Sequence, residues 1–205
     1  MAQIDIFGSY NNVGIQKITD GEYNFEPNFY NKNEADRLYN VLLQNVSWKQ
    51  ESMNIYGKKI NLPRLTAWYG DTEKYYSFSG IHLQPLPWLP ELSKIKEKIQ
   101  QFANAEFNSV LLNLYRNGND SISWHTDAES ELGINPIIGS VNFGETRKFQ
   151  LRHKRTNEKI EIDLNHGSGL VMQGSLQHHW QHQVPKISRP AEQRINLTFR
   201  FIKTL

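Results

Sequence analysis

The sequence predicts an α+β fold, with helices in the N-terminal half packed on one sheet of a C-terminal β-sandwich of the jelly-roll kind. Three observations support this class. Apolar residues recur at helical spacing in two N-terminal segments, short segments rich in β-branched and aromatic residues follow from Ser109 onward, and turn residues separate these segments. Many short strands with even spacing favour a sandwich or barrel over a parallel α/β sheet.

The two helices are predicted from capping residues and apolar periodicity. Residues 1–28 mix short apolar runs with Gly and Asn, and we expect them to be loosely structured. The first helix follows a capping run, Asn31-Lys32-Asn33. Its buried face is predicted to carry Ala35, Leu38, Val41, Leu42 and Val46. The second helix begins after Pro90, and its apolar face carries Leu92, Ile95, Ile99 and Phe102.

The strands are predicted from short segments separated by turn sequences. In chain order the segments are VLLNLY, IIGSVNF, RKFQLRH, KIEIDL, GLVM, HQV and INLTFRFI, with NGND, RTNEK and NHGSG as turns between some of them. No internal repeat, low-complexity segment or interdomain linker interrupts the chain. We therefore expect one domain over residues 1–205, with an N-terminal extension and helix to about residue 50, a middle segment with the second helix at 51–108, and the jelly-roll core at 109–205.

The composition narrows the classes of site and partner. The chain has 205 residues, a formal net charge of +2 and no Cys, which excludes disulfides, thiolate zinc sites and cysteine nucleophiles. The small positive charge is compatible with a nucleic-acid partner. The start, MAQIDIFGSYNN, does not resemble a signal peptide, and no apolar run approaches the ~20 residues of a membrane span. We expect a cytoplasmic monomer without a membrane partner, associated with the nucleoid if the protein is bacterial.

A candidate metal site begins in the stretch ISWHTDAES. In an extended strand His125 and Asp127 point to the same face, where they form either a hydrogen-bonded pair or two arms of a metal site. Further imidazoles follow in QHHWQHQVP, at His178, His179 and His182. Two imidazoles and one carboxylate with open positions are the ligands of non-haem Fe(II) oxygenases.

The last predicted strand carries polar residues on one face. Positions 194, 196, 198 and 200 of RINLTFR place two Arg, an Asn and a Thr on the same side. Such a face either turns to water or lines the interior of a barrel, where buried Arg needs an anionic partner such as a small dicarboxylate. Asn113 and Tyr115 in LLNLYRNG also share a face and could donate to the same ligand.

Basic residues gather around the segment RKFQLRHKR. They are Arg147, Lys148, Arg152, Lys154 and Arg155, with Lys159 just beyond. A charge run of this kind is commonly a solvated hairpin face. Because acidic residues look sparse around it, we favour a hairpin that binds phosphates, which would set affinity without reading base sequence.

Taken together, these motifs resemble a known family. NxY in LLNLYRNG, HxD in SWHTDAE, the later His of HWQHQVP and the closing RINLTFR resemble, in order and spacing, the AlkB family of Fe(II)/2-oxoglutarate dioxygenases. PRLTAWYGD, YYSFSG and LQPLPWLPEL resemble its DNA-repair branch, especially the animal and bacterial homologues that act on duplex DNA. The resemblance covers roughly residues 56–202 and implies a double-stranded β-helix core.

The resemblance also implies a cofactor set and its ligands. His125, Asp127 and His182 would bind Fe(II), with His182 chosen because the family pattern is His-Trp-x-His-x-x-Pro. His179 would then be packed or close to the site, and His178 exposed. The co-substrate 2-oxoglutarate would be held by Arg194 and Arg200, with Asn113, Tyr115 and Thr198 completing its pocket. O₂ would take the remaining position on the metal.

On the substrate side, the resemblance implies a lid and an alkylated base. Tyr76, Phe78 and Ser79 match the family's lid over the base, and Glu129 matches an acidic residue near the base. Arg64 and Tyr56 match residues that contact DNA. Tyr56 would act as a wedge at the tip of a hairpin. The implied reaction is oxidative demethylation of 1-methyladenine and 3-methylcytosine in DNA, or in RNA, with release of formaldehyde, succinate and CO₂. Ala128 departs from close duplex-acting relatives, which carry an acid there.

Two other functions remain open from the residues alone. An oxygenase of the same family that acts on protein or a small molecule would share the iron and 2-oxoglutarate residues but would have no need of YYSFSG, Arg64 or the basic hairpin. A non-catalytic β-sandwich binding module would need neither the convergent ligands nor the two Arg.

Overall fold

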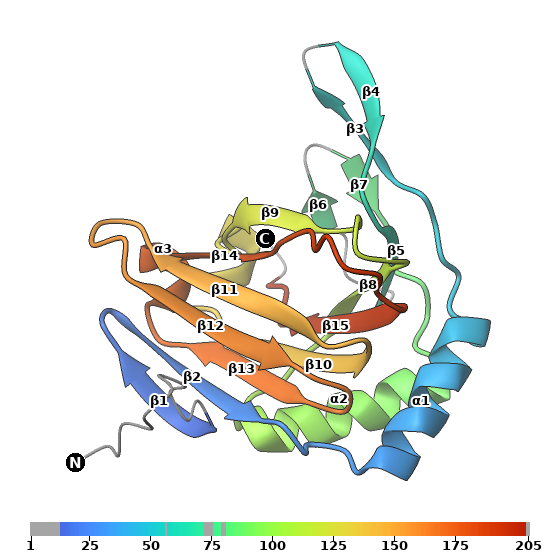
Figure 1. Cartoon of the computed structure of the whole chain (residues 1–205), viewed down its shortest axis with the longest axis horizontal. Coiled ribbons are helices and arrows are strands. Elements are labelled where there is room, and N and C mark those ends of the chain that lie inside the picture. Colours follow the sequence, from blue (N-terminus) through green and yellow to red (C-terminus); the bar gives the residue numbers. More distant parts are fainter. Residues whose placement is uncertain (1–12, 56, 72–75, 79–80, 204–205) are drawn as a thin grey trace.

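The computed structural model describes residues 13–55, 57–71, 76–78 and 81–203 (Figure 1). Its centre is a pair of antiparallel sheets. The larger sheet has the order β1-β2-β13-β10-β15-β8-β5. Its strands are β1 (Gly14–Ile18), β2 (Gly21–Glu26), β5 (Leu65–Gly70), β8 (Ser109–Tyr115), β10 (Ile138–Gly144), β13 (Gly169–Gln173) and β15 (Arg194–Arg200).

The smaller sheet has the order β12-β11-β14-β9 and lies over one face of the larger one (Figure 1). Its strands are β9 (Ile122–His125), β11 (Arg147–His153), β12 (Lys159–Leu164) and β14 (Trp180–Val184). Apolar residues of both sheets form one buried cluster between them, with Phe149 and Trp180 from the smaller sheet and Tyr115 and Leu170 from the larger. This is the layered sandwich predicted from the short, evenly spaced strands.

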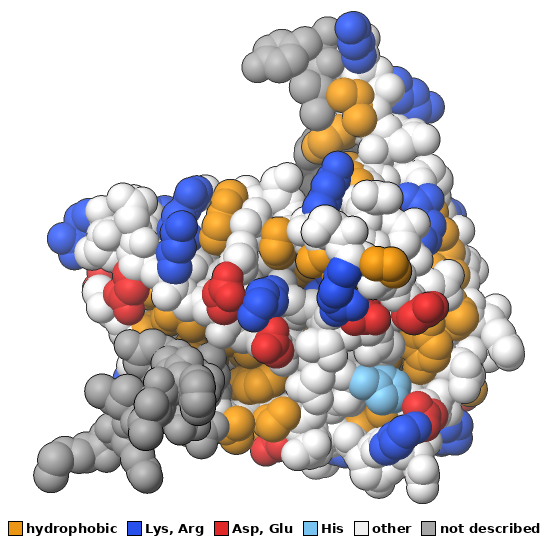
Figure 2. Space-filling view, in the orientation of Figure 1, with side chains coloured by type: hydrophobic (Ala, Val, Ile, Leu, Met, Phe, Trp, Pro, Cys, Tyr) orange, Lys and Arg blue, Asp and Glu red, His pale blue; other side chains and the backbone are white. Residues whose placement is uncertain are grey.

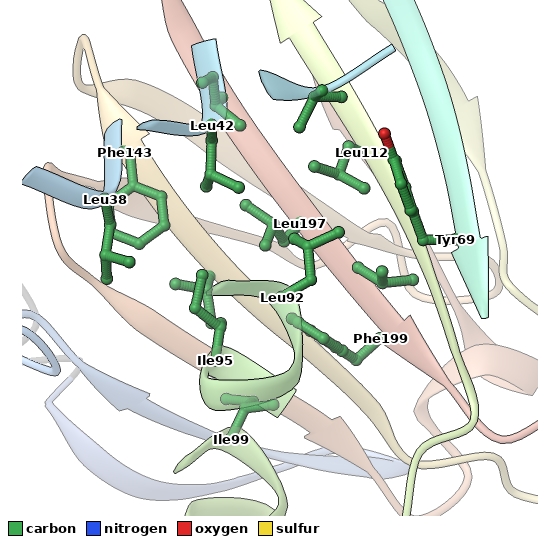
Figure 3. Packing of buried hydrophobic residues seen from close by; sticks show 14 of the residues in the cluster. Leu38, Leu42, Tyr69, Leu92, Ile95, Ile99, Leu112, Phe143, Leu197 and Phe199 are labelled. Atoms are coloured by element: carbon green, nitrogen blue, oxygen red, sulfur yellow. The ribbon is translucent and has the colours of Figure 1, made fainter. Parts of the chain in front are cut away.

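The two predicted helices are confirmed and cover the other face of the larger sheet (Figure 3). In α1 (Lys32–Asn45) the Asn31 side chain caps the first turn by accepting from the backbone N–H of Glu34 at 3.0 Å. In α2 (Pro90–Ala103) Pro occupies the first turn, and Leu92, Ile95 and Ile99 are completely buried. Because helices cover one face, the polar face of β15 is left to point between the sheets.

The N-terminal segment contains structure that the sequence pattern did not predict. Of residues 1–28, the described part from residue 13 forms the β1–β2 hairpin, and β2 pairs with β13 so that Tyr23 and Phe25 are buried. The expectation of loose structure was wrong there because pairing to an existing sheet edge outweighs the weak local propensity of Gly and Asn.

Two smaller hairpins and two helical turns complete the fold. The hairpin of β3 (Ser52–Ile55) and β4 (Lys58–Asn61) extends away from the body, as Figure 1 shows, and agrees with the hairpin predicted around NIYGKK, residues 54–59. β6 (Tyr76–Phe78) pairs with β7 (Ile81–Leu83). The 3₁₀ turn η1 (Ser130–Leu132) follows β9, and α3 (Leu176–His179) precedes β14. Among the described residues, no helix has the length and apolarity needed to span a membrane.

Candidate active site

Two imidazoles and a carboxylate meet between the sheets. His125 and His182 are direct partners across β9 and β14, and their ring centroids are 4.2 Å apart. One carboxylate oxygen of Asp127 lies 4.0 Å from Nε2 of His125, and the other lies 3.9 Å from Nε2 of His182. The convergence predicted from HxD and the later His is therefore present. One detail was wrong: β9 ends at His125, so Asp127 lies in the loop beyond the strand.

The protonation states of these groups suit a metal ligand set. Nδ1 of His125 is 2.8 Å from the carbonyl oxygen of Ser123 and donates to it, so in the neutral ring Nε2 is the nitrogen that carries the lone pair, and it faces Asp127. Burial lowers the pKa of His182 to about 3, so this ring is neutral at neutral pH. Burial opposes ionisation of Asp127, but the charge of Arg200, with those of His182 and His125 when these rings are protonated, outweighs it and lowers the carboxyl pKa to about 2. An ionised carboxylate and neutral imidazoles are the forms that bind a divalent metal.

His182 is oriented by packing. Its Nδ1 is buried and has no hydrogen-bond partner among the described residues, whereas most metal-binding imidazoles have one. Its ring lies 5.2 Å from the ring of Phe149 and against the ring of His125. These two aromatic neighbours therefore hold the ring plane.

Arg194 is a buried cation without an anionic partner in the described part of the chain. Its side chain is 1% exposed, and burial lowers its pKa to about 10. Nη2 donates to Oδ1 of Asn142 at 2.6 Å, while Nε and Nη1 have no partner there. The guanidinium also lies 5.0 Å from the centre of the Tyr115 ring. A buried guanidinium with two open donors requires an anion, and a carboxylate matches its fork.

The predicted polar face of β15 lines the same cavity. Ile195, Leu197 and Phe199 point to the helices and are completely buried there, so the alternating residues point between the sheets. The space between the lining atoms, open mouth included, is about 490 Å³. Its polar lining includes every residue predicted to bind the metal or 2-oxoglutarate: Asn113, Tyr115, His125, Asp127, His182, Arg194, Thr198 and Arg200. The alternative of a water-facing strand is thereby excluded.

The two predicted Arg occupy different positions in this cavity. Arg200 donates through Nη2 to Oδ1 of Asp127 at 2.9 Å, so it stands beside the His-Asp-His group. Arg194 lies six positions earlier on the same strand, next to Tyr115. Thr198, between them, donates from its hydroxyl to Oδ1 of Asn196 at 3.1 Å. The His-Asp-His group thus lines one end of the cavity, and the guanidinium of Arg194 lines the other.

Arg64 lies against this cavity. Its Nε donates to Oδ1 of Asn113 at 2.8 Å, and its Nη1 donates to the carbonyl oxygen of Ser121 at 3.2 Å. With its oxygen engaged, Asn113 keeps its amide hydrogens as donors for a ligand. The structure therefore associates Arg64 with the 2-oxoglutarate residues, and its contact with DNA stays a prediction.

The other predicted substrate residues are less completely described. Glu129 is half-buried, and burial is the main cause that raises the pKa of its carboxyl. The backbone of Tyr76 and Phe78 lies in β6, but their side chains, like Ser79 and Tyr56 as a whole, lie outside the described residues.

The basic segment differs from its predicted role. Arg147 is 2% exposed, and its Nη2 donates inward to the carbonyl oxygens of Asp120 and Pro185, so it cannot face phosphates. Lys148 lies 3.3 Å from Asp163 and 3.4 Å from Glu161, two acids of the neighbouring β12. The expectation that acids are sparse there was therefore wrong, because strand pairing brings in acids distant in sequence.

The remaining basic side chains of that hairpin are partly engaged. Arg152 stacks 4.4 Å from the Trp124 ring centre and donates to Gln181 at 3.0 Å. Lys154 donates to the carbonyl oxygen of His178 at 2.7 Å. Arg155 and Lys159 are exposed. Phosphate binding by this hairpin stays a prediction that now rests on fewer charges.

The expectations for the other two His of QHHWQHQVP were only partly correct. His178 and His179 lie in α3 and not in a strand. His178 is exposed, as expected, but His179 exposes 47% of its side chain and is not packed beside the metal ligands.

His179 instead joins a cluster with Asp20 and His153, whose ligand-type atoms lie within 4.8 Å of one another. Nδ1 of His153 accepts the backbone N–H of Thr156 at 3.1 Å, so the ring proton lies on Nε2, which donates to Asp20 at 3.2 Å. A protonated nitrogen cannot bind a metal. We interpret this cluster as a hydrogen-bonded link between the β1–β2 turn and the end of β11.

Two residues of the site were missed at the level of sequence. Asn142 accepts from Arg194, and Gln177 accepts the backbone N–H of Asp127 at 2.9 Å. Both are buried amides that belong to no recognisable motif. Only the pairing of β10 with β15 and the packing of α3 bring them to the site.

Comparison with known proteins supports the same kind of site. The model of the 2OG-Fe(II) oxygenase superfamily matches residues 24–200. "Alpha-ketoglutarate-dependent dioxygenase alkB homolog 3" of Homo sapiens is 42% identical over 186 residues, which is 86% of this chain and 64% of that protein. "DNA oxidative demethylase ALKBH2" of Homo sapiens is 36% identical over 184 residues, which is 84% of this chain and 70% of that protein. The chain thus spans just under two thirds of the length of the first of these relatives.

Solved structures agree on the fold. "The structure of OsALKBH1" superimposes with a TM-score of 0.58 at 18% identity and covers 91% of this chain and 99% of that one. A prolyl hydroxylase from Trichoplax adhaerens in complex with a hypoxia-inducible factor peptide gives a TM-score of 0.60 at 13% identity. The superposition covers 90% of this chain and 84% of that one. These likenesses confirm the double-stranded β-helix core.

Proposed function

The chain belongs to the 2OG-Fe(II) oxygenase superfamily, and on that premise we propose that it is a dioxygenase that demethylates N-alkylated bases of nucleic acids. The cofactors of the family are Fe(II), 2-oxoglutarate and O₂, and the residues of the cavity fit them. 1-Methyladenine and 3-methylcytosine in DNA are the substrates that we propose in particular.

One observation carries this proposal. A single cavity joins a buried His-Asp-His group to a buried guanidinium that has two open donors and no anionic partner in the described part of the chain. Such a cavity can hold a metal at one end and a carboxylate at the other. A buried cation without an anionic partner destabilises the fold, so it is retained only where it serves a ligand. A binding module without catalysis would not need such a cation together with a His-Asp-His group.

Each side chain then has a defined task. His125, Asp127 and His182 would hold Fe(II), Arg200 keeps the Asp127 carboxylate in place, and Arg194 would bind the far carboxylate of 2-oxoglutarate. When bound, iron, 2-oxoglutarate and O₂ supply the oxidation of an N-methyl carbon, with succinate, CO₂, formaldehyde and the free base nitrogen as products. Apolar residues that line the cavity, among them Leu111, Leu164 and Met172, would exclude water from the co-substrate.

The choice of an alkylated base rests on the relatives and on charge. Methylation at N1 of adenine or N3 of cytosine makes the ring a cation, and Glu129, close enough to Asp127 and His125 for their charges to influence its pKa, would favour such a ring. Extrusion of the base from a stack costs roughly a few kcal/mol. A methyl group that blocks Watson–Crick pairing lowers that cost.

The proposal is tested with purified protein, Fe(II), 2-oxoglutarate and oligonucleotides that carry one methylated adenine or cytosine, in DNA and RNA, single-stranded and duplex. We expect formaldehyde in amounts equal to the repaired base, with none from unmethylated oligonucleotides. Succinate release that responds only to a peptide or a small molecule would show an oxygenase of another substrate class.

The extended hairpin provides a prediction about nucleic-acid affinity. Lys58 and Lys59 are exposed on β4, and Figure 2 shows Lys or Arg side chains at the end of this projection. We expect the Lys58→Ala, Lys59→Ala double variant to reduce the slope of log affinity against log salt by about 0.7 per lysine on single strands and about 0.9 on duplex. Fluorescence anisotropy at several salt concentrations measures the slope.

The matched control removes the same charge elsewhere. Lys17 on β1 and Lys94 on α2 are exposed, and β1 lies at the opposite edge of the larger sheet from β5. We expect Lys17→Ala with Lys94→Ala to leave the slope unchanged. Equal slopes for the two double variants would remove the hairpin from the nucleic-acid interface.

A further inference from the structure

The loop that carries Asp127 is held from behind by Gln177. Because Asp127 lies beyond the last residue of β9, its backbone N–H has no partner in the strand ladder. That N–H donates to Oε1 of Gln177 at 2.9 Å. Gln177 comes from α3, fifty positions along the chain, and its side chain is 1% exposed. The contact therefore links the loop of one metal ligand to the segment that leads into β14 and His182.

The Gln177 side chain has a single orientation. While Oε1 accepts from Asp127, Nε2 lies 3.6 Å from the sulfur of Met172 and donates to it. An amide flipped by half a turn would present its hydrogens to the Asp127 N–H and lose both contacts. Away from water, such a loss is not repaired by solvent.

α3 itself is anchored, so Gln177 starts from a fixed base. Lys154 donates to the carbonyl oxygen of His178 at 2.7 Å, and the hydroxyl of Ser175 donates to the carbonyl oxygen of Asp20 at 3.1 Å. Leu176 is completely buried in the cluster between the sheets. The position of the Gln177 oxygen is thus set by surrounding structure and not by the loop that it holds.

The main chain and the carboxylate of Asp127 are held separately. Arg200 donates to Oδ1 of the carboxylate, whereas Gln177 accepts from the backbone N–H. A carboxylate fixed at one end only could rotate about the loop and present its oxygens away from His125 and His182. Both anchors are therefore needed to keep one oxygen toward each imidazole, at 4.0 and 3.9 Å.

We propose that Gln177 is a positioning residue of the metal centre, which acts through the backbone of Asp127 and does not touch the metal. This proposal deepens the proposed function and rests on Asp127 as a metal ligand. Loss of a partner that orients a metal ligand lowers metal affinity by about 10–100-fold. The same loss is expected here when the Oε1 acceptor is removed.

The test measures metal binding directly. Mn(II) serves as a redox-silent probe, and electron paramagnetic resonance of the free ion gives the affinity of each variant without turnover. In Gln177→Met the side chain keeps its length and apolar volume but loses the amide oxygen, and we expect Mn(II) affinity to fall by about 10–100-fold. Thermal unfolding of the metal-free variant shows whether it is folded.

Two further variants make the outcome decisive. In Gln177→Asn the amide is retained but is one methylene too short to reach Asp127, so we expect a similar loss, and this variant carries the test if Gln177→Met does not fold. In Gln181→Met the same substitution is made on β14, where the side chain contacts Arg152 on the outer side of the sheet. We expect this control to bind Mn(II) as the unaltered protein does.

Measurements of Mn(II) affinity distinguish the role of Gln177 from the proposed dioxygenase function. If the unaltered protein binds Mn(II) and His125→Ala abolishes that binding, the metal centre stands. Folded Gln177→Met or Gln177→Asn with unchanged Mn(II) affinity then overturns the role of Gln177 alone. An unaltered protein that binds neither Mn(II) nor Fe(II) overturns both.

Discussion

Exchanging Arg194 for Met is expected to abolish 2-oxoglutarate binding while making the unliganded protein more stable. The side chain is 1% exposed, and its Nε and Nη1 have no partner in the described part of the chain. Desolvation of an ion costs several kcal/mol, and the hydrogen bonds of Arg194 to Asn142 and Tyr115 return only part of it. Oδ1 of Asn142 keeps a donor after the exchange, because Nδ2 of Asn196 lies 3.1 Å from it. We therefore expect a gain in the free energy of unfolding of about 1–4 kcal/mol.

The measurement is denaturant unfolding with and without 2-oxoglutarate in the presence of Mn(II). At a concentration one hundred times its Kd, the ligand adds about 2.7 kcal/mol to the stability of the unaltered protein, and it should add nothing to Arg194→Met. Arg152→Met is the matched control, because Arg152 is half-buried on the outer side of the smaller sheet, against Trp124. It should keep 2-oxoglutarate binding. An Arg194→Met variant that binds 2-oxoglutarate normally would remove Arg194 from the pocket.

Loss of the imidazole of His182 is expected to abolish turnover and leave the fold largely intact. His182→Ala removes one of the three converging side chains that we propose as metal ligands, and the metal affinity should fall by more than the ~100-fold upper range for residues that only orient ligands. The imidazole is neutral and its Nδ1 has no partner among the described residues, so its removal leaves no charge unpaired. The fold loses packing against Phe149, and we expect a cost of about 0.5–3 kcal/mol, as for most single substitutions.

Formaldehyde release and Mn(II) affinity measure the effect of His182→Ala, and thermal unfolding reports its stability. His178→Ala is the control, because His178 lies four positions earlier, is exposed and is not among the cavity residues. It should retain both activity and metal affinity. Near-normal turnover by His182→Ala would exclude this residue as an iron ligand.

The helices and most strands could be predicted because their signals are local. The Asn31 cap, Pro90 and the apolar stripe of each helix depend on neighbours within a few turns, and the structure confirms both helices. The alternation in RINLTFR was equally clear, and the structure resolves which face points inward. By contrast, the β1–β2 hairpin was missed although Asp20-Gly21 and the alternating Tyr23 and Phe25 are local hairpin signals, and its pairing with the edge of β13 has no local signal at all.

The residues of the candidate site divide in the same way. His125, Asp127, His182 and Arg194 belong to motifs that resemble those of a known family, so their place along the chain was enough to single them out as candidates. The inward direction of Arg147, the contact of Arg64 with Asn113 and the support of Asp127 by Gln177 have no such signal. Each of these contacts joins residues 27 or more positions apart, and their side chains are of types common on protein surfaces.

The sequence by itself therefore determined the fold class and the kind of chemistry, and it supplied the candidate residues for the metal and 2-oxoglutarate, because periodicity, motif spacing and the family resemblance of those motifs are properties of the chain alone. Only the tertiary structure decided which charges are buried, which are paired and which side chains support the ligands. Burial and pairing depend on distances between segments remote in sequence. Those distances exist only once the two sheets have closed over the cavity.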